Sequence, residues 1–141
     1  MFVLFMLFTT LFAANIDYSI CLSDPTQTEV IFTKVDGDPW PPVIGSKFKL
    51  NMVGVLDRYC ETFIARPVLK MHNGDEWTPV PLGNKDLCGT VVRCPVLPGP
   101  ISINFEMEIP NMSPPGTYKG EFTFTDGDYN ITCLGFMLDM K

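Results

Sequence analysis

The sequence predicts an all-β protein, an immunoglobulin-like antiparallel β-sandwich of about seven strands. In several segments apolar and polar residues alternate with period two, which is typical of strands with one buried face. The 13 prolines and 11 glycines are spread over 141 residues, and this frequency favours short strands joined by turns. No amphipathic helical stretch is longer than two turns. Together these patterns indicate one domain of ordinary size.

Residues 1–14 are predicted to be a secretory signal peptide, which leaves residues 15–141 as the mature domain. Twelve of these 14 residues are apolar and none is charged. The run is shorter than the roughly 18 apolar residues that suggest a membrane span, and it ends in the small residues Ala13 and Ala14. A buried first strand and an uncleaved anchor are the alternatives. Removal of the segment would leave a soluble, exported protein.

Within the mature chain, the alternation of apolar and polar residues predicts where the strands lie. They are expected at 16–21, 28–34, 47–56, 61–71, 101–109, 117–125 and 129–140. In 101–109 every second residue is apolar, from Ile101 to Ile109. A turn at 126–128 joins the last two strands into a hairpin. Proline-rich connectors are expected at 38–42, 78–81, 95–100 and 110–115.

Charge and histidine content exclude several classes of function. The formal charge of −6 argues against a nucleic-acid partner, because phosphate binding needs a basic excess. His72 is the single histidine, which rules out most histidine-based catalysis and most histidine-rich metal sites. No nucleophile with an orienting partner can be assembled around it. The chain is therefore not expected to be an enzyme, to need a cofactor or to hold a metal ion.

The mature chain has five cysteines, at 21, 60, 88, 94 and 133. An exported protein meets an oxidising compartment, where disulfides form. Because five is odd, at least one thiol is unpaired or pairs between chains. The sequence alone does not fix the connectivity. Cys88 and Cys94 enclose a plausible small loop, a bridge between Cys21 and Cys133 would join the two ends, and Cys60 is the one left over.

The second half of the chain resembles the ML lipid-recognition superfamily, which includes the Niemann–Pick type C cholesterol carrier and phosphatidylglycerol/phosphatidylinositol transfer proteins. The motifs that carry this resemblance are Asp86-Leu87-Cys88, Cys94-Pro95, Pro114-Pro115-Gly116-Thr117-Tyr118 and Ile131-Thr132-Cys133. The resemblance implies a sandwich whose two sheets splay apart and hold one lipid between them. It also implies the disulfides Cys21–Cys133 and Cys88–Cys94, and it offers no counterpart for Cys60.

A lipid slot needs large, adaptable apolar side chains on the inner strand faces. The residues predicted to line it are Phe48, Leu50, Met52, Phe63, Ile103, Phe105, Met107, Tyr118, Phe122, Phe124, Phe136 and Met137. Periodicity cannot distinguish this slot from a filled sandwich core. The mouth is expected at Val80, Leu82, Ile109, Pro110, Met112 and Pro115, where Met112 would dip into a bilayer during exchange.

The expected function is that of a secreted or endolysosomal carrier of a single sterol or phospholipid, acting as a monomer with transient membrane contact. A receptor or a membrane lipid transporter is the protein partner that the resemblance allows. The alternatives are an immunoglobulin-like interaction module with a solid core, or a lipid-presenting cofactor for a receptor or hydrolase. Asn130 begins an N-glycosylation sequon, Asn130-Ile131-Thr132, and is expected to be accessible beside its turn.

Overall fold

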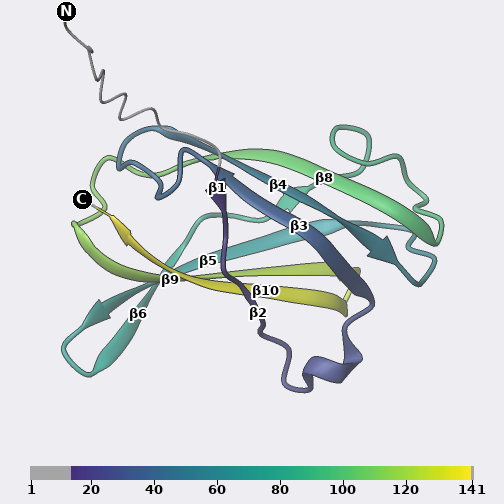
Figure 1. Ribbon diagram of the computed structural model, residues 1–141, viewed down its shortest axis with the longest axis horizontal. Coiled ribbons are helices and arrows are strands. Elements are labelled where there is room, and N and C mark those ends of the chain that lie inside the picture. The colour runs from purple at the N-terminus through teal and green to yellow at the C-terminus, as the bar shows by residue number, and fades with distance from the viewer. Residues whose placement is uncertain (1–13, 141) are drawn as a thin grey trace, which may run out of the picture.

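The computed structural model describes residues 14–140, which form two antiparallel β-sheets (Figure 1). The first sheet has the order β1-β3-β4-β8. Its strands are β1 (Ala14–Asn15), β3 (Val30–Asp38), β4 (Lys47–Leu56) and β8 (Gly99–Glu108). The second sheet has the order β2-β10-β9-β5-β6, and β7 also pairs with β5. Its strands are β2 (Ser19–Ile20), β5 (Ile64–Asn73), β6 (Glu76–Pro81), β7 (Lys85–Asp86), β9 (Gly116–Asp126) and β10 (Tyr129–Met140).

The predicted fold class is confirmed, and the long strands lie close to their predicted positions. One short 3₁₀ helix, Pro25–Gln27, interrupts the strands in the part of the chain that the structure describes. No helix between residues 14 and 140 is long and apolar enough to cross a membrane. The predicted signal peptide falls on residues 1–14, and residues 1–13 lie outside the described part of the chain.

The expected first strand, 16–21, is shorter than predicted, because only Ser19–Ile20 of this range forms a strand, β2, while β1 lies just before the range and belongs to the other sheet. β1 pairs with β3, and β2 pairs with β10. The chain between them crosses from one sheet to the other along one edge of the sandwich, as the purple segment in Figure 1 shows. At this edge the Tyr18 hydroxyl donates to the Phe32 carbonyl oxygen, 3.3 Å away. This edge of the sandwich is therefore covered by the chain itself.

The prediction of a connector at 78–81 is wrong, because these residues belong to strand β6. Pro79 and Pro81 lie opposite Lys70 and Val68 of β5. Both prolines occupy alternate positions on the last strand of the sheet, so their missing N–H groups face away from β5. Proline is tolerated there because an edge strand has no further neighbour to donate to. Residues that look like a loop in sequence can therefore extend the sheet.

The pairing of β9 with β10 shows how one glycine shapes the core. Gly120 lies opposite Phe136. A Cβ atom at Gly120 would come within 2.7 Å of the Phe136 ring. The absence of a side chain lets this ring lie flat over the strand and stack on Phe122, with ring centroids 5.3 Å apart.

Both disulfides that the resemblance implies are present. Cys21 is bonded to Cys133, and Cys88 to Cys94. Glu121 lies near the first pair, but sulfurs joined in a disulfide offer no thiolate to a metal. Cys60 is free and buried, and burial raises the pKa of its thiol. A buried thiol held in its neutral form is a poor nucleophile.

Candidate functional site

An apolar layer of aromatic and aliphatic side chains lies between the two sheets. The predicted slot residues Phe105 and Phe122 come from opposite sheets, and their rings meet edge to face with centroids 5.8 Å apart. Phe122 stacks in turn on Phe136. The predicted slot residues that are less than one-tenth exposed are Phe48, Leu50, Met52, Phe63, Ile103, Phe105, Tyr118, Phe122, Phe124 and Phe136. The layer is apolar, and the rings of Phe105, Phe122 and Phe136, which are in contact, close it at its centre.

Of the three methionines predicted to line the slot, Met52 is buried, and the other two differ from it. Met107 is half-buried and follows the inner-face pattern of β8. The inward placement of Met137 is wrong, because this residue is 53% exposed. Phe136 and Met137 are consecutive residues of β10, and successive side chains in a strand point to opposite faces. Only one of the two could face the other sheet, and it is Phe136.

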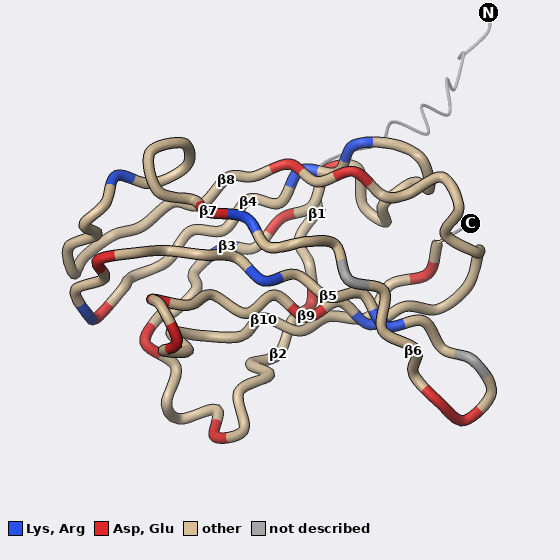
Figure 2. The backbone as a smooth tube through the Cα atoms, turned by 180° about the vertical axis from the view of Figure 1, so that it is seen from behind, with Lys and Arg blue, Asp and Glu red and all other residues tan. Residues whose placement is uncertain are grey.

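The second edge of the sandwich is open, between β8 of the first sheet and the segment 82–91 that includes β7. Figure 2 shows β7 and β8 beside each other in the rear view. Two pockets lie at this edge. The smaller, about 280 Å³, extends from Leu82 and Lys85 to the inner-face residues Pro67, Phe105 and Met107. A groove from the outside therefore reaches the apolar layer.

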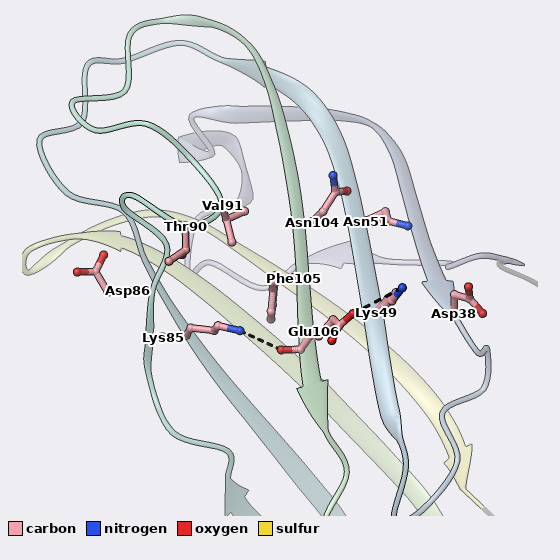
Figure 3. Close-up of a pocket in the computed structure, with 10 residues that line it drawn as sticks. All are labelled: Asp38, Lys49, Asn51, Lys85, Asp86, Thr90, Val91, Asn104, Phe105 and Glu106. Atoms are coloured by element: carbon pink, nitrogen blue, oxygen red, sulfur yellow. Dashed lines mark hydrogen bonds and ion pairs between the residues drawn. The ribbon is translucent and has the colours of Figure 1, made fainter.

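The larger pocket, about 770 Å³, joins this edge to the outer face of the first sheet (Figure 3). Its volume lies in the range of sites that take small molecules, roughly 300–1,000 Å³. Its lining residues are Asp38, Lys49, Asn51, Lys85, Asp86, Thr90, Val91, Asn104, Phe105 and Glu106. Lys85, Phe105 and Glu106 line both pockets. These three residues mark the place where polar surface meets the apolar layer.

Two lysines contact Glu106 in different ways (Figure 3). The Lys85 ammonium donates to the Glu106 carbonyl oxygen, 3.1 Å away. The Lys49 ammonium lies 3.5 Å from the Glu106 carboxylate. The Lys85 hydrogen bond crosses from the second sheet to the first at the open edge. Neither Lys85 nor Glu106 is among the site residues that the sequence predicts.

The predicted mouth residues are distributed around this opening rather than gathered in it. Leu82 lines the smaller pocket, and Val80 lies half-buried in β6. The placement of Ile109 at the rim is wrong, because this residue is only 2% exposed. Its backbone N–H donates to Ser46 and its carbonyl accepts from Gly45, and these bonds hold it in the core. Pro110, Met112 and Pro115 lie exposed in the loop that follows β8.

The loop 109–115 and the loop 39–46 form one end of the sandwich, which we call the uncharged tip. Neither loop contains a charged residue, and the Ile109 bonds to Gly45 and Ser46 join them. Met112 is 93% exposed at this tip, and Val43 is 39% exposed. The Tyr118 hydroxyl donates to the Pro114 carbonyl and anchors the loop from below. The tip adjoins the smaller pocket, which extends along β8 to Glu108.

The opposite end of the sandwich is tied by a polar cluster. Arg58, just after β4, lies 3.3 Å from Glu29 and 3.5 Å from Asp126. Its guanidinium also stacks on the Tyr129 ring, 3.9 Å from the centroid. Asp126 accepts hydrogen bonds from the Thr62 hydroxyl and backbone N–H, at 2.8 and 3.0 Å. These contacts fasten the two sheets together at the end away from the tip.

Replacing Asp126 by asparagine is expected to reduce stability at neutral pH. The Thr62 hydroxyl, with the Thr62 and Glu61 backbone N–H groups and the Arg58 charge, lowers the pKa of Asp126 from its ordinary value. A lowered folded-state pKa stabilises the fold above the unfolded-state pKa of about 3.9, and this stability is lost as the pH falls through the folded-state pKa. The loss for Asp126→Asn should be about 1 kcal/mol at pH 7 and should vanish in acid. Denaturant unfolding of the native protein and the variant, at pH 7 and in acid, measures this difference in stability.

The control for this prediction is Asp128→Asn in the same turn, because the Thr62 hydrogen bonds go to Asp126 and not to Asp128. An equal loss of stability in both variants would contradict the role given to Asp126. So would a loss that persists below the folded-state pKa.

The chain is similar to known proteins both in sequence and in structure. The family model described as the ML domain matches residues 15–140. A putative phosphatidylglycerol/phosphatidylinositol transfer protein of Dictyostelium discoideum is 30% identical over 104 residues, covering 73% of this chain and 71% of the relative. A phosphatidylglycerol/phosphatidylinositol transfer protein of Candida albicans is 32% identical over 117 residues, covering 75% of this chain and 54% of the relative.

Two solved structures share the fold. A Niemann–Pick type C2 protein from the Japanese carpenter ant superimposes with a TM-score of 0.66 at 18% identity, over 89% of this chain and 99% of that one. Chicken MD-1, in complex with lipid IVa, superimposes with a TM-score of 0.58 at 20% identity, over 86% of each chain. At these identities the likeness concerns the sandwich architecture.

Proposed function

The chain belongs to the ML domain family of lipid-binding proteins, and we propose that it carries one phospholipid or sterol between its sheets and transfers it between membranes. The observation that supports the proposal most directly is the difference between the two edges of the sandwich. One edge is covered by the crossing chain between β1 and β2. The other has a pocket that reaches Phe105 and Met107 of the apolar layer.

The physical work of such a carrier is the transfer of apolar surface out of water. Each buried CH₂ group of the ligand contributes about 0.8 kcal/mol, so one acyl chain or a sterol body supplies enough free energy for binding. The smaller pocket, about 280 Å³, leads to aromatic rings that are in contact. We propose that a lipid chain inserts from this pocket and moves these rings aside. Met107, half-buried in its wall, adapts its shape readily to such a ligand.

The setting that we propose is an exported protein in an extracellular or endolysosomal space. The two disulfides among the described residues support this proposal, because such bonds persist in oxidising compartments. Asn130 is exposed where β10 begins, and we propose it as a glycosylation site. It lies beside the β9–β10 turn, at the end away from the tip, so a glycan there would leave the opening free.

The proposed function is tested by uptake of a fluorescent phospholipid and a fluorescent sterol from vesicles. We expect the folded protein to take up at least one of them and to deliver it to acceptor vesicles. A folded protein that takes up neither would contradict the proposal. Competition with the unlabelled lipid separates occupancy of the site from adsorption of the dye to the surface.

Replacing Met112 by glutamate is expected to slow transfer without reducing the amount of lipid that the protein holds. The uncharged tip adjoins the smaller pocket, and Met112 is its most exposed apolar side chain. A charge that must approach the bilayer costs free energy, and we expect transfer between vesicles to be roughly three- to tenfold slower. Stopped-flow transfer from donor to acceptor vesicles measures the rate.

Leu97→Glu is the matched control, because Leu97 is 68% exposed and follows Val96, which is paired with Cys60 at the other end of the sandwich. We expect it to transfer lipid at the native rate. Equal slowing in both variants would place membrane contact elsewhere than at the uncharged tip.

A further inference from the structure

Lys85 is the cation at the junction between the apolar layer and the polar surface. It is exposed, it lines both pockets of the open edge, and its ammonium lies 6.0 Å from the centroid of the Phe105 ring. Phe105 is 4% exposed and faces the other sheet. The ammonium of Lys85 therefore lies next to the edge of the apolar layer. An amphiphile whose tail lies against Phe105 would bring its polar group to this ammonium.

The partner of Lys85 in this structure is neutral. Its ammonium donates to the Glu106 backbone carbonyl at 3.1 Å. Lys49, the other cation of the larger pocket, faces the Glu106 carboxylate at 3.5 Å. A hydrogen bond to a neutral carbonyl is weaker than one to an anion. An anionic oxygen arriving at the opening would therefore compete well for Lys85.

The two carboxylates closest to Lys85 in sequence and contact, those of Asp86 and Glu106, are held by other groups. The Glu106 carboxylate lies against Lys49 on the outer face of the first sheet. One carboxylate oxygen of Asp86 accepts the backbone N–H of Cys88 at 2.9 Å, and Figure 3 shows this carboxylate directed away from Phe105. Among the described residues, no ion pair joins Lys85 to Glu108 or to Asp38, the other carboxylates that line the two pockets. Lys85 is thus free to exchange its carbonyl for an anionic ligand.

We propose that Lys85 binds the phosphate group of a phospholipid whose acyl chain occupies the layer behind Phe105. This inference rests on the proposed function and names the ligand class, a lipid that bears a phosphate, as distinct from a sterol or another neutral lipid. On binding, the ammonium leaves the Glu106 carbonyl and donates to a phosphate oxygen. The same step removes a hydrogen bond that joins the two sheets at the open edge, so headgroup capture and opening of the edge are coupled.

The experiment compares two lipids with the same acyl chains, phosphatidylglycerol and diacylglycerol, which differ in the phosphate headgroup. Binding of each from vesicles of neutral lipid is measured for the native protein and for Lys85→Met, Lys85→Arg and Lys34→Met. Lys34 is an exposed lysine on β3, so its replacement makes the same change in charge away from the opening. Folding of each variant is checked by its unfolding midpoint.

We expect Lys85→Met to bind phosphatidylglycerol about tenfold more weakly, which is the usual size of one charge-assisted hydrogen bond. Diacylglycerol binding should be unchanged, Lys85→Arg should stay within about twofold of the native protein, and Lys34→Met should match it. Inorganic phosphate at millimolar concentration should not displace the lipid, because it lacks the acyl chains that supply most of the binding free energy.

Two results would overturn the role of Lys85 while leaving the carrier function intact. One is an unchanged ratio of phosphatidylglycerol to diacylglycerol binding in Lys85→Met. The other is displacement of the lipid by millimolar inorganic phosphate, which would make this a site for free phosphate. A native protein that binds neither lipid would overturn the carrier function, and the role of Lys85 with it.

Discussion

Replacing Phe105 by glutamate is expected to abolish lipid uptake. Phe105 is 4% exposed, lines the wall of both pockets and meets Phe122 of the other sheet. A carboxylate there would have to be desolvated against the lipid chain, at a cost of several kcal/mol. Since about 1.4 kcal/mol corresponds to a factor of ten in affinity, we expect binding to weaken by about 100-fold or more. Uptake of a fluorescent lipid from vesicles measures the change.

Two further variants keep this prediction testable if Phe105→Glu does not fold. Met107→Trp places a larger apolar side chain at the half-buried wall of the smaller pocket, so it should obstruct the lipid without introducing a charge. Ser102→Glu adds the same charge to the exposed outer face of β8 and should bind lipid normally. A folded Phe105→Glu or Met107→Trp protein with native uptake would show that lipid does not pass between β8 and β7.

Removing the Cys21–Cys133 disulfide is expected to cause the largest loss of stability. The bridge spans 112 residues and joins the end of β2 to β10 of the second sheet. In the chain-entropy model, closing a loop of this length stabilises the folded state by about 5 kcal/mol. The free energy of unfolding should fall by roughly this amount in the double variant Cys21→Ser/Cys133→Ser. Denaturant unfolding under oxidising conditions measures the difference.

The second disulfide supplies the control. Cys88–Cys94 spans six residues, and the same model gives it only about 2 kcal/mol. The corresponding double variant should therefore lose less than half as much stability. Equal losses from both pairs would show that loop closure in the unfolded chain is not the source of the stabilisation.

Strands β4 and β8 could be predicted from sequence because each has one buried and one exposed face. In β4 and β8, apolar residues recur at every second position, and the register places Leu50 opposite Phe105. The strands at the open edge, β6 and β7, could not be predicted in this way. β6 contains prolines that read as a loop, and β7 has two exposed residues, too few to show any period. Lys85 belongs to β7, and its position beside Phe105 depends on pairing between strands far apart in the chain.

The alternation of apolar and polar residues does not determine two further features, which the structure shows. The first is which of two adjacent apolar residues faces inward, as with Phe136 and Met137. The second is where the apolar layer can be reached from outside. The predicted rim residue Ile109 looks like a loop residue before a proline, but its backbone bonds to Ser46 and Gly45 place it in the core. The opening lies instead along the β8 edge.

The apolar layer between the sheets is expected to hold a lipid, and analysis of lipid extracted from the protein measures this. The protein is purified from the cells that make it, without detergent, and its organic extract is analysed by mass spectrometry. We expect about one lipid molecule per protein chain, with a phosphate headgroup. A folded protein whose extract contains no lipid, and which takes up none from vesicles, would contradict the claim.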